Sequence, residues 1–351
     1  MTDTTVFRLA ASSALLSFAL AGSLVAQDQP AAQMVRGPVM GFVLDKASGV
    51  RPILGVPGAA TLGQTVLDKA GLESVTPSAG RDYALAVLSS GRQTVLVRNL
   101  SAAPSAAILD VTPGATRIEV SPSGDAAALY YADTRRVEVL AGLPASPSVA
   151  WSIELADLQD GLAALAVSDG GGALLVARAG DQAPVWFVTP DAGQNVLCSV
   201  DGSPSLTFLT GSLDAAVVDG VAASVVVVRN PKAEPQLTRV GGQAQGISRP
   251  LAIAAARDNT RLFVANAEPA GVVSLSLAGE EPATLPCDCT PTGLERMASG
   301  SAFRLSDAGA GPIWLLDASS TPARIVFVPE QTQILRESVS SPLPGRRGGD
   351  R

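Results

Sequence analysis

Five charged residues could take part in chemistry, because each lies in a short run of the kind that forms β-strands. They are Glu73, Arg117, Glu119, Glu295 and Arg296. Carboxylates and guanidinium groups that face one another can hold a polar ligand or a calcium ion. A water-filled channel also tolerates a few charges that bind nothing. The interpretation we favour is therefore a solvated group of charges, and a ligand site formed by the five residues is the alternative.

The most informative absence is histidine, of which the chain has none. Without imidazole there is no Ser-His-Asp or Cys-His catalysis, no His-ligated haem and none of the usual zinc sites. Gly-rich phosphate-binding loops, the G-x-S-x-G elbow and the EF-hand pattern are also missing. We therefore assign no catalytic, metal-binding or cofactor-binding residue. An enzyme with this sequence would rely on Asp, Glu, Arg or bound calcium alone.

The three cysteines, Cys198, Cys287 and Cys289, are too few to build a scaffold from disulfides. Cys287 and Cys289 lie in "CDCTPTG", where one repeat is expected to cross to the next, and Cys198 is expected at a similar crossover. We expect buried or loop thiols without a function. The alternatives are a disulfide between Cys287 and Cys289, which would be strained because adjacent strand positions point in opposite directions, and a metal or redox site.

The N-terminus has the pattern of a secretory signal peptide over residues 1–26. Arg8 precedes the apolar run Leu9–Val25, and we place cleavage after Ala26. An uncleaved membrane anchor is the alternative, but the run is short for a membrane span. We expect a periplasmic or secreted protein that does not span a membrane after cleavage. Residues 340–351, rich in Pro, Gly and Arg, are expected to be a disordered tail.

Composition excludes some partners. The formal net charge is −7, and no Lys/Arg cluster occurs inside the body of the chain. Because nucleic-acid binding requires a basic surface, we expect no nucleic-acid partner. The chain is 47% hydrophobic, which is enough for a large core.

The elements that would position these residues recur with a period of about 44. The stretches "VSPSGDAAALYYADTRRVEVLAG" and "AARDNTRLFVANAEPAGVVSLSLAG" each contain a small-residue turn between two apolar runs. The turn residues are Gly80, Gly124, Gly171, Gly211, Asn259 and Gly300. Val-rich and Leu-rich runs bounded by Gly, Asp, Asn and Pro indicate strands and not helices. Four short strands in such a period are typical of a β-propeller blade.

The stretches "SPSGDAAALYY" and "RDNTRLFVANAEPAGVVSLSL" resemble the repeats of YVTN-type and WD-type bacterial β-propellers, although the tryptophan-aspartate pair is missing. The resemblance implies a β-propeller. Together with the period of about 44 residues it predicts an all-β, seven-bladed β-propeller over residues 27–339, with four antiparallel strands per blade. We name these strands a to d from the channel to the rim. Seven units fit into the mature chain, whereas eight do not. The five charged residues then lie on inner strands.

Two similar hairpins, Val43–Gly58 and Leu315–Glu330, suggest how the ring closes. We interpret both as c–d pairs. The first blade would take strands b–d from N-terminal residues near 33–57, and strand a from "TQILRESV" (332–339). Such closure removes open sheet edges.

The combined prediction for function is an exported, non-enzymatic interaction module. Its partner would be an unknown envelope protein or a small ligand, and the protein would be a monomer. The alternative is an enzyme of lactonase or hydrolase type, as some YVTN-like propellers are.

Overall fold

The computed structural model describes residues 37–329 except 159, 192, 299 and 309–310. Within those residues nearly all regular structure is β-strand, and two single turns of 3-10 helix, η1 (Asp169–Gly171) and η2 (Gln243–Gln245), complete it. The predicted signal peptide (1–26), the predicted closing strand (332–339) and the predicted tail (340–351) lie outside the described residues.

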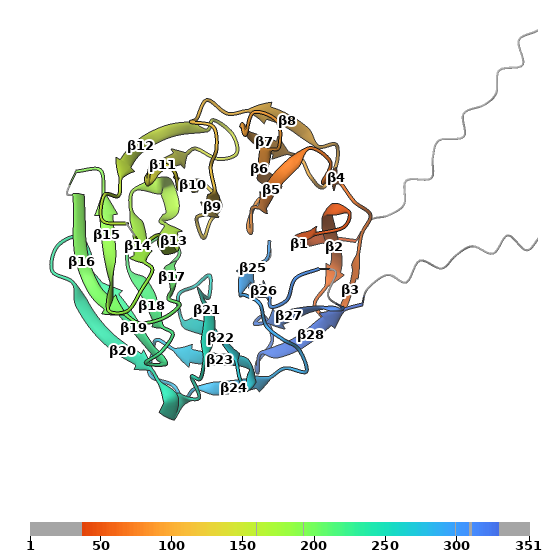
Figure 1. Ribbon diagram of the computed structural model, residues 1–351. Helices are drawn as coiled ribbons and strands as arrows, with labels where there is room; N and C mark the ends of the chain where they lie inside the picture. Colours follow the sequence, from red (N-terminus) through yellow and green to blue (C-terminus); the bar gives the residue numbers. More distant parts are fainter. Residues whose placement is uncertain (1–36, 159, 192, 299, 309–310, 330–351) are drawn as a thin grey trace, which may run out of the picture. The chain divides into compact units, whose positions relative to one another are not determined.

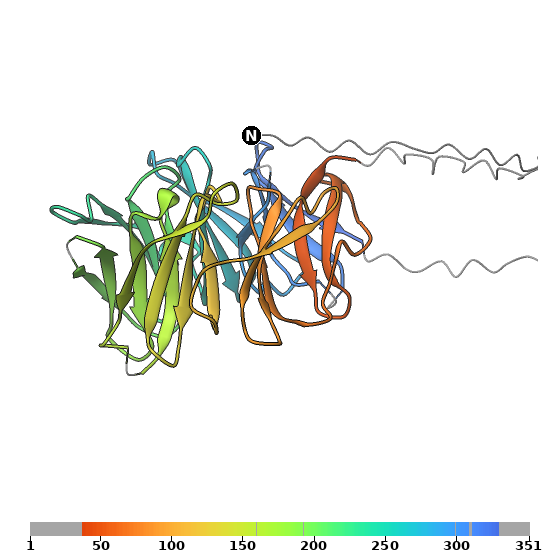
Figure 2. The ribbon, with the colours of Figure 1, turned by 90° about the horizontal axis from the view of Figure 1, so that it is seen from above.

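The strands form seven four-stranded antiparallel sheets, which Figure 1 shows as the blades of a ring. In blades 2–7 the strands follow one another in chain order from the centre of the ring to its rim. Figure 2 turns the ring by 90° and shows the strands running between its two faces. The prediction of a seven-bladed β-propeller is confirmed.

The strands of blades 2–7 fall into four positions. The inner strands, a, are β5 (Leu72–Pro77), β9 (Arg117–Val120), β13 (Leu162–Val167), β17 (Ser205–Phe208), β21 (Pro250–Ala255) and β25 (Glu295–Arg296). Strands b are β6 (Tyr83–Leu88), β10 (Ala126–Tyr131), β14 (Leu174–Arg178), β18 (Ala215–Asp219), β22 (Arg261–Ala267) and β26 (Ala302–Arg304). Strands c are β7 (Thr94–Arg98), β11 (Arg136–Ala141), β15 (Ala183–Thr189), β19 (Ser224–Arg229), β23 (Ala270–Ser276) and β27 (Ile313–Asp317). The outer strands, d, are β8 (Ser105–Ile108), β12 (Ser148–Glu154), β16 (Gly193–Val200), β20 (Gln236–Gly241), β24 (Ala283–Pro286) and β28 (Arg324–Val328).

The apolar runs of the sequence become strands that are covered on both sides. All six residues of β10 are buried, because each face of its sheet packs against a neighbouring blade. One such core joins Ala128 and Val137 of blade 3 to Val167 and Leu174 of blade 4. The ring is therefore held together by a hydrophobic core at each junction between blades.

The period of the sequence is set by the turns between strands a and b. All six turn residues named above lie in these turns. Gly124 has φ = 72°, which favours glycine, and a Cβ at this position would lie 2.4 Å from Ser78 Oγ of the preceding blade. Asn259 has φ = 57°, a conformation that asparagine adopts more readily than most residues.

The same turns also join neighbouring blades by hydrogen bonds. Asp169 of blade 4 accepts bonds from the backbone N–H of Ser123 in blade 3 and of Gly211 in blade 5. The carboxylate of Asp125 accepts a bond from Gly170 N–H in the next blade. These aspartates satisfy backbone donors, as their turn positions predict.

Blade 1 is built differently. It contains β1 (Val39–Asp45), β2 (Gly49–Val56), β3 (Ala59–Leu62) and β4 (Leu67–Asp68). β1 occupies one edge of β2, so β3 and β4, which pair with successive parts of β2, share the other edge and fill one strand position. Three strand positions are thus occupied.

The direction of β1 shows which positions these are. Its beginning, Met40, accepts a hydrogen bond from Ala298 N–H, just after β25, and its end, Asp45, pairs in parallel with Ala308, just after β26. β1 therefore runs in the direction of β26, which is strand b of blade 7. β1, β2 and β3–β4 correspond to strands b, c and d, so N-terminal residues supply these three strands as predicted, but they span residues 39–68 and not the predicted region near 33–57.

The prediction that both similar hairpins are c–d pairs is wrong for the first one. Val43–Gly58 contains parts of β1 and β2, with β3 beyond them, whereas β28 in the second hairpin is the outermost strand of its blade. The two hairpins do not hold equivalent places in the ring.

What the hairpins share is a turn. Asp45 accepts a bond from Ala47 N–H, and Asp317 accepts one from Ser319 N–H. Each aspartate also pairs with an arginine on the following strand, Asp45 with Arg51 and Asp317 with Arg324. The two sequences therefore match because both hairpins use the same turn and the same aspartate–arginine pair.

Candidate functional site

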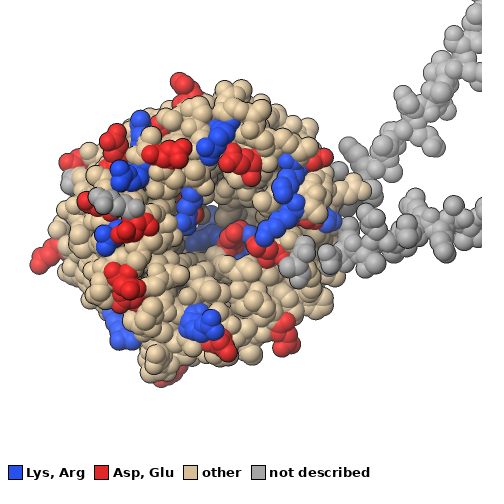
Figure 3. Space-filling view, in the orientation of Figure 1, with Lys and Arg blue, Asp and Glu red and all other residues tan. Residues whose placement is uncertain are grey.

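The inner strands surround a cavity of about 480 Å³ in the middle of the ring. Every blade contributes to its wall, from Phe42 on β1 to Glu295 and Arg296 on β25. Figure 3 shows the central hollow, with basic and acidic side chains at its rim. Apolar residues outnumber polar ones in the wall, but polar and apolar atoms share its exposed surface about equally, and the charged residues come from blades 1, 3 and 7.

Arg117 and Glu119 form an ion pair on one side of β9. Arg117 Nε lies 2.7 Å from Glu119 Oε1, and the guanidinium also donates to the carbonyl of Ala163 in the next blade, at 3.0 Å. The residues are two positions apart on a strand, so their side chains lie on the same face of the sheet. Glu119 lines the cavity, and Arg117 holds its carboxylate from the side.

The protonation of Glu119 depends on opposing influences. Burial in the channel wall raises the pKa of this carboxyl, and the positive charge and hydrogen bond of Arg117 lower it without cancelling the rise. The negative charge of Glu295 raises the pKa of Glu119 further. The two carboxylates therefore repel each other across the cavity. A cation or a hydrogen-bond donor placed between them would relieve this repulsion.

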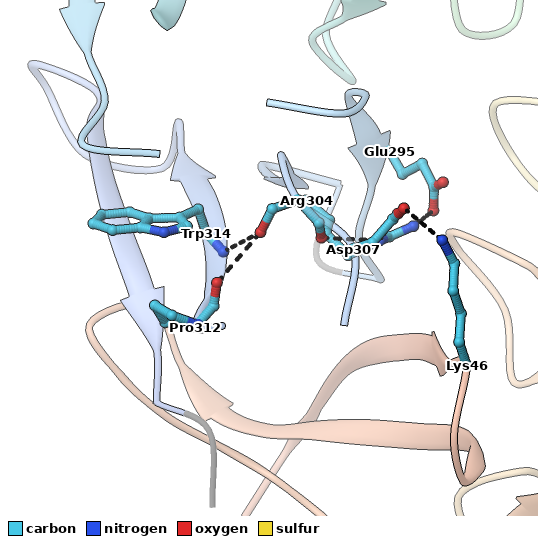
Figure 4. Close-up of polar contacts among 7 residues, drawn as sticks. Lys46, Glu295, Arg304, Asp307, Pro312 and Trp314 are labelled. Carbon is cyan, nitrogen blue, oxygen red and sulfur yellow. Dashed lines mark hydrogen bonds and ion pairs between the residues drawn. The ribbon is translucent and has the colours of Figure 1, made fainter. Parts of the chain in front are cut away.

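Glu295 belongs to a second network at the junction of blades 7 and 1, drawn in Figure 4. Its carboxylate pairs with Arg304, which lies opposite it on β26. Arg304 also contacts Asp307 at 3.1 Å, and Asp307 in turn contacts Lys46 of blade 1 at 3.7 Å. The chain of charges runs from the channel wall of blade 7 to the end of β1.

Arg304 is the buried centre of this network, with 9% of its side chain exposed against 64% for Glu295 and 41% for Asp307. Burial alone would lower the pKa of Arg304, but the charges and hydrogen bonds of Glu295 and Asp307 outweigh it and raise that pKa. The guanidinium also donates to the carbonyl of Ser306, at 2.9 Å. It is charged and fixed in position.

Arg296 occupies another part of the channel wall. Its guanidinium donates to the carbonyl of Ala255 at 2.5 Å and lies 5.7 Å from the centre of the Phe303 ring. Burial lowers the pKa of Arg296; the carboxylate of Asp169 opposes this effect, and the charge of Arg257 adds to it. Its contacts hold neighbouring blades together.

The five residues predicted from sequence do lie on inner strands, but the structure does not bring them all together. Glu119, Glu295 and Arg296 line the cavity, and Arg117 supports Glu119. Glu73, at the beginning of β5, is exposed and pairs with Arg92 at 3.2 Å. Arg92 lines a separate surface cleft of about 380 Å³ beside Tyr131. Glu73 therefore does not belong to the channel.

Sequence reasoning missed three cavity residues, Lys46, Arg304 and Asp307. Arg304 lies on a strand b, a position from which no residue lines the cavity in blades 2–6. The signal that could have identified it is an arginine in the apolar run "SAFRLS", because a buried arginine requires acidic partners.

The cysteines lie away from this cavity. Cys287 and Cys289 form a disulfide directly after β24, with their Cα atoms 5.0 Å apart. Cys198 is a free thiol on β16, so the prediction that it occupies a crossover is wrong. Burial, together with the charge of Asp219, raises the pKa of Cys198 to about 11, which keeps the thiol protonated.

Among the residues that the structure describes, no group of three or more His, Cys, Asp or Glu side chains is arranged to hold a metal ion. In the part of the chain that the structure describes, no helix has the length and apolar character that a membrane crossing needs.

The chain matches no protein-family model and no curated protein. Among solved structures, it is similar to a functionally unknown protein from Desulfotomaculum acetoxidans, with 14% identity, a TM-score of 0.58, and coverage of 83% of this chain and 95% of that one. It is also similar to a proposed 6-phosphogluconolactonase from Bacteroides fragilis, with 11% identity, a TM-score of 0.52, and coverage of 85% and 99%. The β-propeller domain of Cps50 (Swd1) from Myceliophteria thermophila gives 8% identity, a TM-score of 0.52, and coverage of 74% and 87%.

These likenesses show a β-propeller. At sequence identities this low, structural similarity indicates a shared fold but not a shared activity, because one fold supports many functions. What the protein does has to be argued from its own residues.

Proposed function

We propose that the protein is an exported, non-enzymatic binding module whose central channel holds a small polar ligand. The observation that carries the proposal is the central cavity of about 480 Å³, which is open to solvent and whose wall includes Glu119 and Glu295 from inner strands of different blades. Ligand sites typically combine a mostly apolar wall with a few convergent polar groups. The N-terminal signal pattern supports the exported location.

The charges favour one class of ligand. Glu119 and Glu295 repel each other, so a ligand that places an amine or several hydroxyl groups between them gains free energy on binding. Arg117 and Arg304 pair with these two carboxylates and also donate to the carbonyls of Ala163 and Ser306, whereas each carboxylate keeps further lone pairs that can accept from a ligand. We therefore expect amines and polyols, including sugars with free hydroxyl groups, to bind better than simple anions.

The experiment is a thermal-shift screen of amines, polyols and organic acids against the mature chain, followed by calorimetric titration of each compound that binds. The expected result is at least about a 10-fold loss of affinity in Glu119→Gln, which corresponds to 1.4 kcal/mol. Glu73→Gln is the matched control, since Glu73 is an exposed glutamate on an inner strand outside the cavity. Equal affinity in wild type, Glu119→Gln and Glu73→Gln would place binding outside the channel.

An enzyme of lactonase or hydrolase type is the second possibility, and one observation favours it. Burial raises the pKa of Glu119, and a carboxyl in a cleft with a raised pKa is a candidate general acid or base. A panel of lactones and esters tests this. Turnover that is lost in Glu119→Gln or in Arg296→Ala would replace the binding module with an enzyme.

A further inference from the structure

The charges on the channel wall are unevenly distributed around the ring. Glu119 comes from blade 3, and Glu295 belongs to the network at the junction of blades 7 and 1. The cavity-lining residues of blades 4–6 include no charged side chain and are apolar apart from Thr207. Arg296 of blade 7 is turned toward these blades, because its guanidinium reaches the carbonyl of Ala255 in blade 6. The two carboxylates and the guanidinium of Arg296 therefore face different parts of the cavity.

Arg296 differs from the other cations of the wall because no carboxylate of the described residues forms an ion pair with it. Lys46 and Arg304 both pair with Asp307. Arg296 instead donates one N–H to the carbonyl of Ala255, and its remaining N–H groups have no acceptor among the described residues. Its guanidinium can therefore donate to a ligand without giving up a bond within the protein.

The guanidinium of Arg296 is also fixed in position. It lies 5.7 Å from the centre of the Phe303 ring, which is a cation–π contact, and the bond to Ala255 holds it from a second side. A donor that is already fixed loses little conformational freedom when a ligand binds. Burial lowers the pKa of Arg296, and the charge of Asp169 does not restore it, so the protein compensates this positive charge only in part.

Glu119 is in the opposite situation on another part of the wall. Its carboxylate has one arginine partner, Arg117, and is repelled by Glu295. Blades 1 and 2 separate blade 3, which carries Glu119, from blade 7 on one side of the ring, and blades 4–6 separate them on the other side. A ligand that contacts both Glu119 and Arg296 therefore spans the channel, and it is best served by a positive group at one end and a negative group at the other.

We propose that the channel ligand is a zwitterion, an amino acid or a related compound with separate ammonium and carboxylate groups. Its ammonium group lies between Glu119 and Glu295, and its carboxylate accepts hydrogen bonds from Arg296. The carbon chain of the ligand lies against the apolar wall of blades 4–6. A guanidinium suits a carboxylate because its planar N–H groups match the two oxygens. This inference rests on the proposed function and adds to it a residue that selects the ligand.

Calorimetric titration of the mature chain with ω-amino acids tests the inference without any variant. Glycine, γ-aminobutyrate and ε-aminocaproate differ in the separation of their charged groups, and the one that binds best is compared with its amide, which keeps the ammonium group and lacks the negative charge. The expected result is that the amino acid binds at least about 10-fold more tightly than its amide. Equal affinity for both overturns this inference and leaves the proposed function intact. If no amine and no amino acid binds, both fail.

The substitution Arg296→Met tests where the carboxylate lies. Methionine keeps an apolar side chain beside Phe303 and removes the donors, so it is expected to abolish the difference between the amino acid and its amide. Glu119→Gln is expected to lower the affinity for both compounds and to keep the difference.

Arg257→Met is the matched control, because Arg257 is an exposed arginine whose charge acts on Arg296 but which does not line the cavity. Equal effects of the two arginine variants would assign the preference to positive charge in general and overturn the inference. If Arg296→Met does not fold, the comparison of the amino acid with its amide in the wild type decides.

Discussion

The buried guanidinium of Arg304 allows the sharpest test of the network at the junction of blades 7 and 1. The substitution Arg304→Met keeps a long apolar stem and removes the charge. It deletes contacts to Glu295, to Asp307 and to the carbonyl of Ser306. The free-energy cost of losing Arg304 differs among the three partners, because they differ in how far they are exposed to water.

The magnitude follows from that access. The carboxylates of Glu295 and Asp307 are 64% and 41% exposed, so water replaces much of what they lose, and Asp307 keeps Lys46. Ser306 is buried, and leaving its carbonyl unpaired costs about 1–3 kcal/mol. Breaking a fully buried ion pair costs about 3–5 kcal/mol. We therefore expect Arg304→Met to lose about 2 kcal/mol, or about 4 °C in melting temperature.

The assay is thermal unfolding of the mature chain, followed by circular dichroism. Arg249→Met is the matched control, because Arg249 pairs with Glu268 on the surface with 70% and 71% of the two side chains exposed, and such pairs contribute little. Adding Glu295→Gln to Arg304→Met should recover part of the loss by removing a carboxylate that repels Glu119. A melting temperature of Arg304→Met at or above that of wild type would refute the reasoning.

Two further predictions concern the turns. Burial alone would raise the pKa of Asp317, but the hydrogen bonds from Ser319 and the pairing with Arg324 outweigh it and lower that pKa. The ionised carboxylate therefore stabilises the fold at pH values above its unfolded-state pKa, near 3.8, and this stabilisation is lost as the pH falls through the lower pKa of the folded state. Asp317→Asn should therefore be less stable than wild type at pH 7 by about 1–2 kcal/mol, and urea denaturation at lower pH should show the gap closing below about pH 4; a gap that is constant with pH would contradict this account. Gly124→Ala should lower the melting temperature more than Gly170→Ala, because both glycines have φ near 70° but only a Cβ at Gly124 meets another blade; equal losses would mean that the contact with Ser78 is easily relieved.

Most of the fold prediction depended on the recurrence of turn residues about every 44 positions. The backbone at Gly124 and Asn259 has positive φ, which favours glycine or asparagine at these positions. Such residues therefore recur in the sequence with the spacing of the blades. Blade number follows from that spacing. The place of the hairpin Val43–Gly58 within its blade could not be predicted in the same way. Asp45 and Asp317 indicate that the two hairpins have the same kind of turn, but they do not indicate whether a further strand follows the hairpin.

The site was predictable only in part, for a geometric reason. An alternating strand shows which residues share a side, but it does not show where along the channel a residue lies. Glu73 and Glu119 both lie on inner strands, yet Glu73 is at the very beginning of β5 and emerges on the surface, whereas Glu119 faces the cavity. Arg304 was missed because it reaches the channel from strand b at the one junction where no described inner strand covers it.

The most direct test of the central claim is a crystal structure of the mature chain with the best ligand from the screen. The account predicts electron density for the ligand inside the ring, between Glu119 and Glu295, in contact with inner strands of several blades. Density for the ligand only on an outer face of the ring, with the channel holding water, would contradict it.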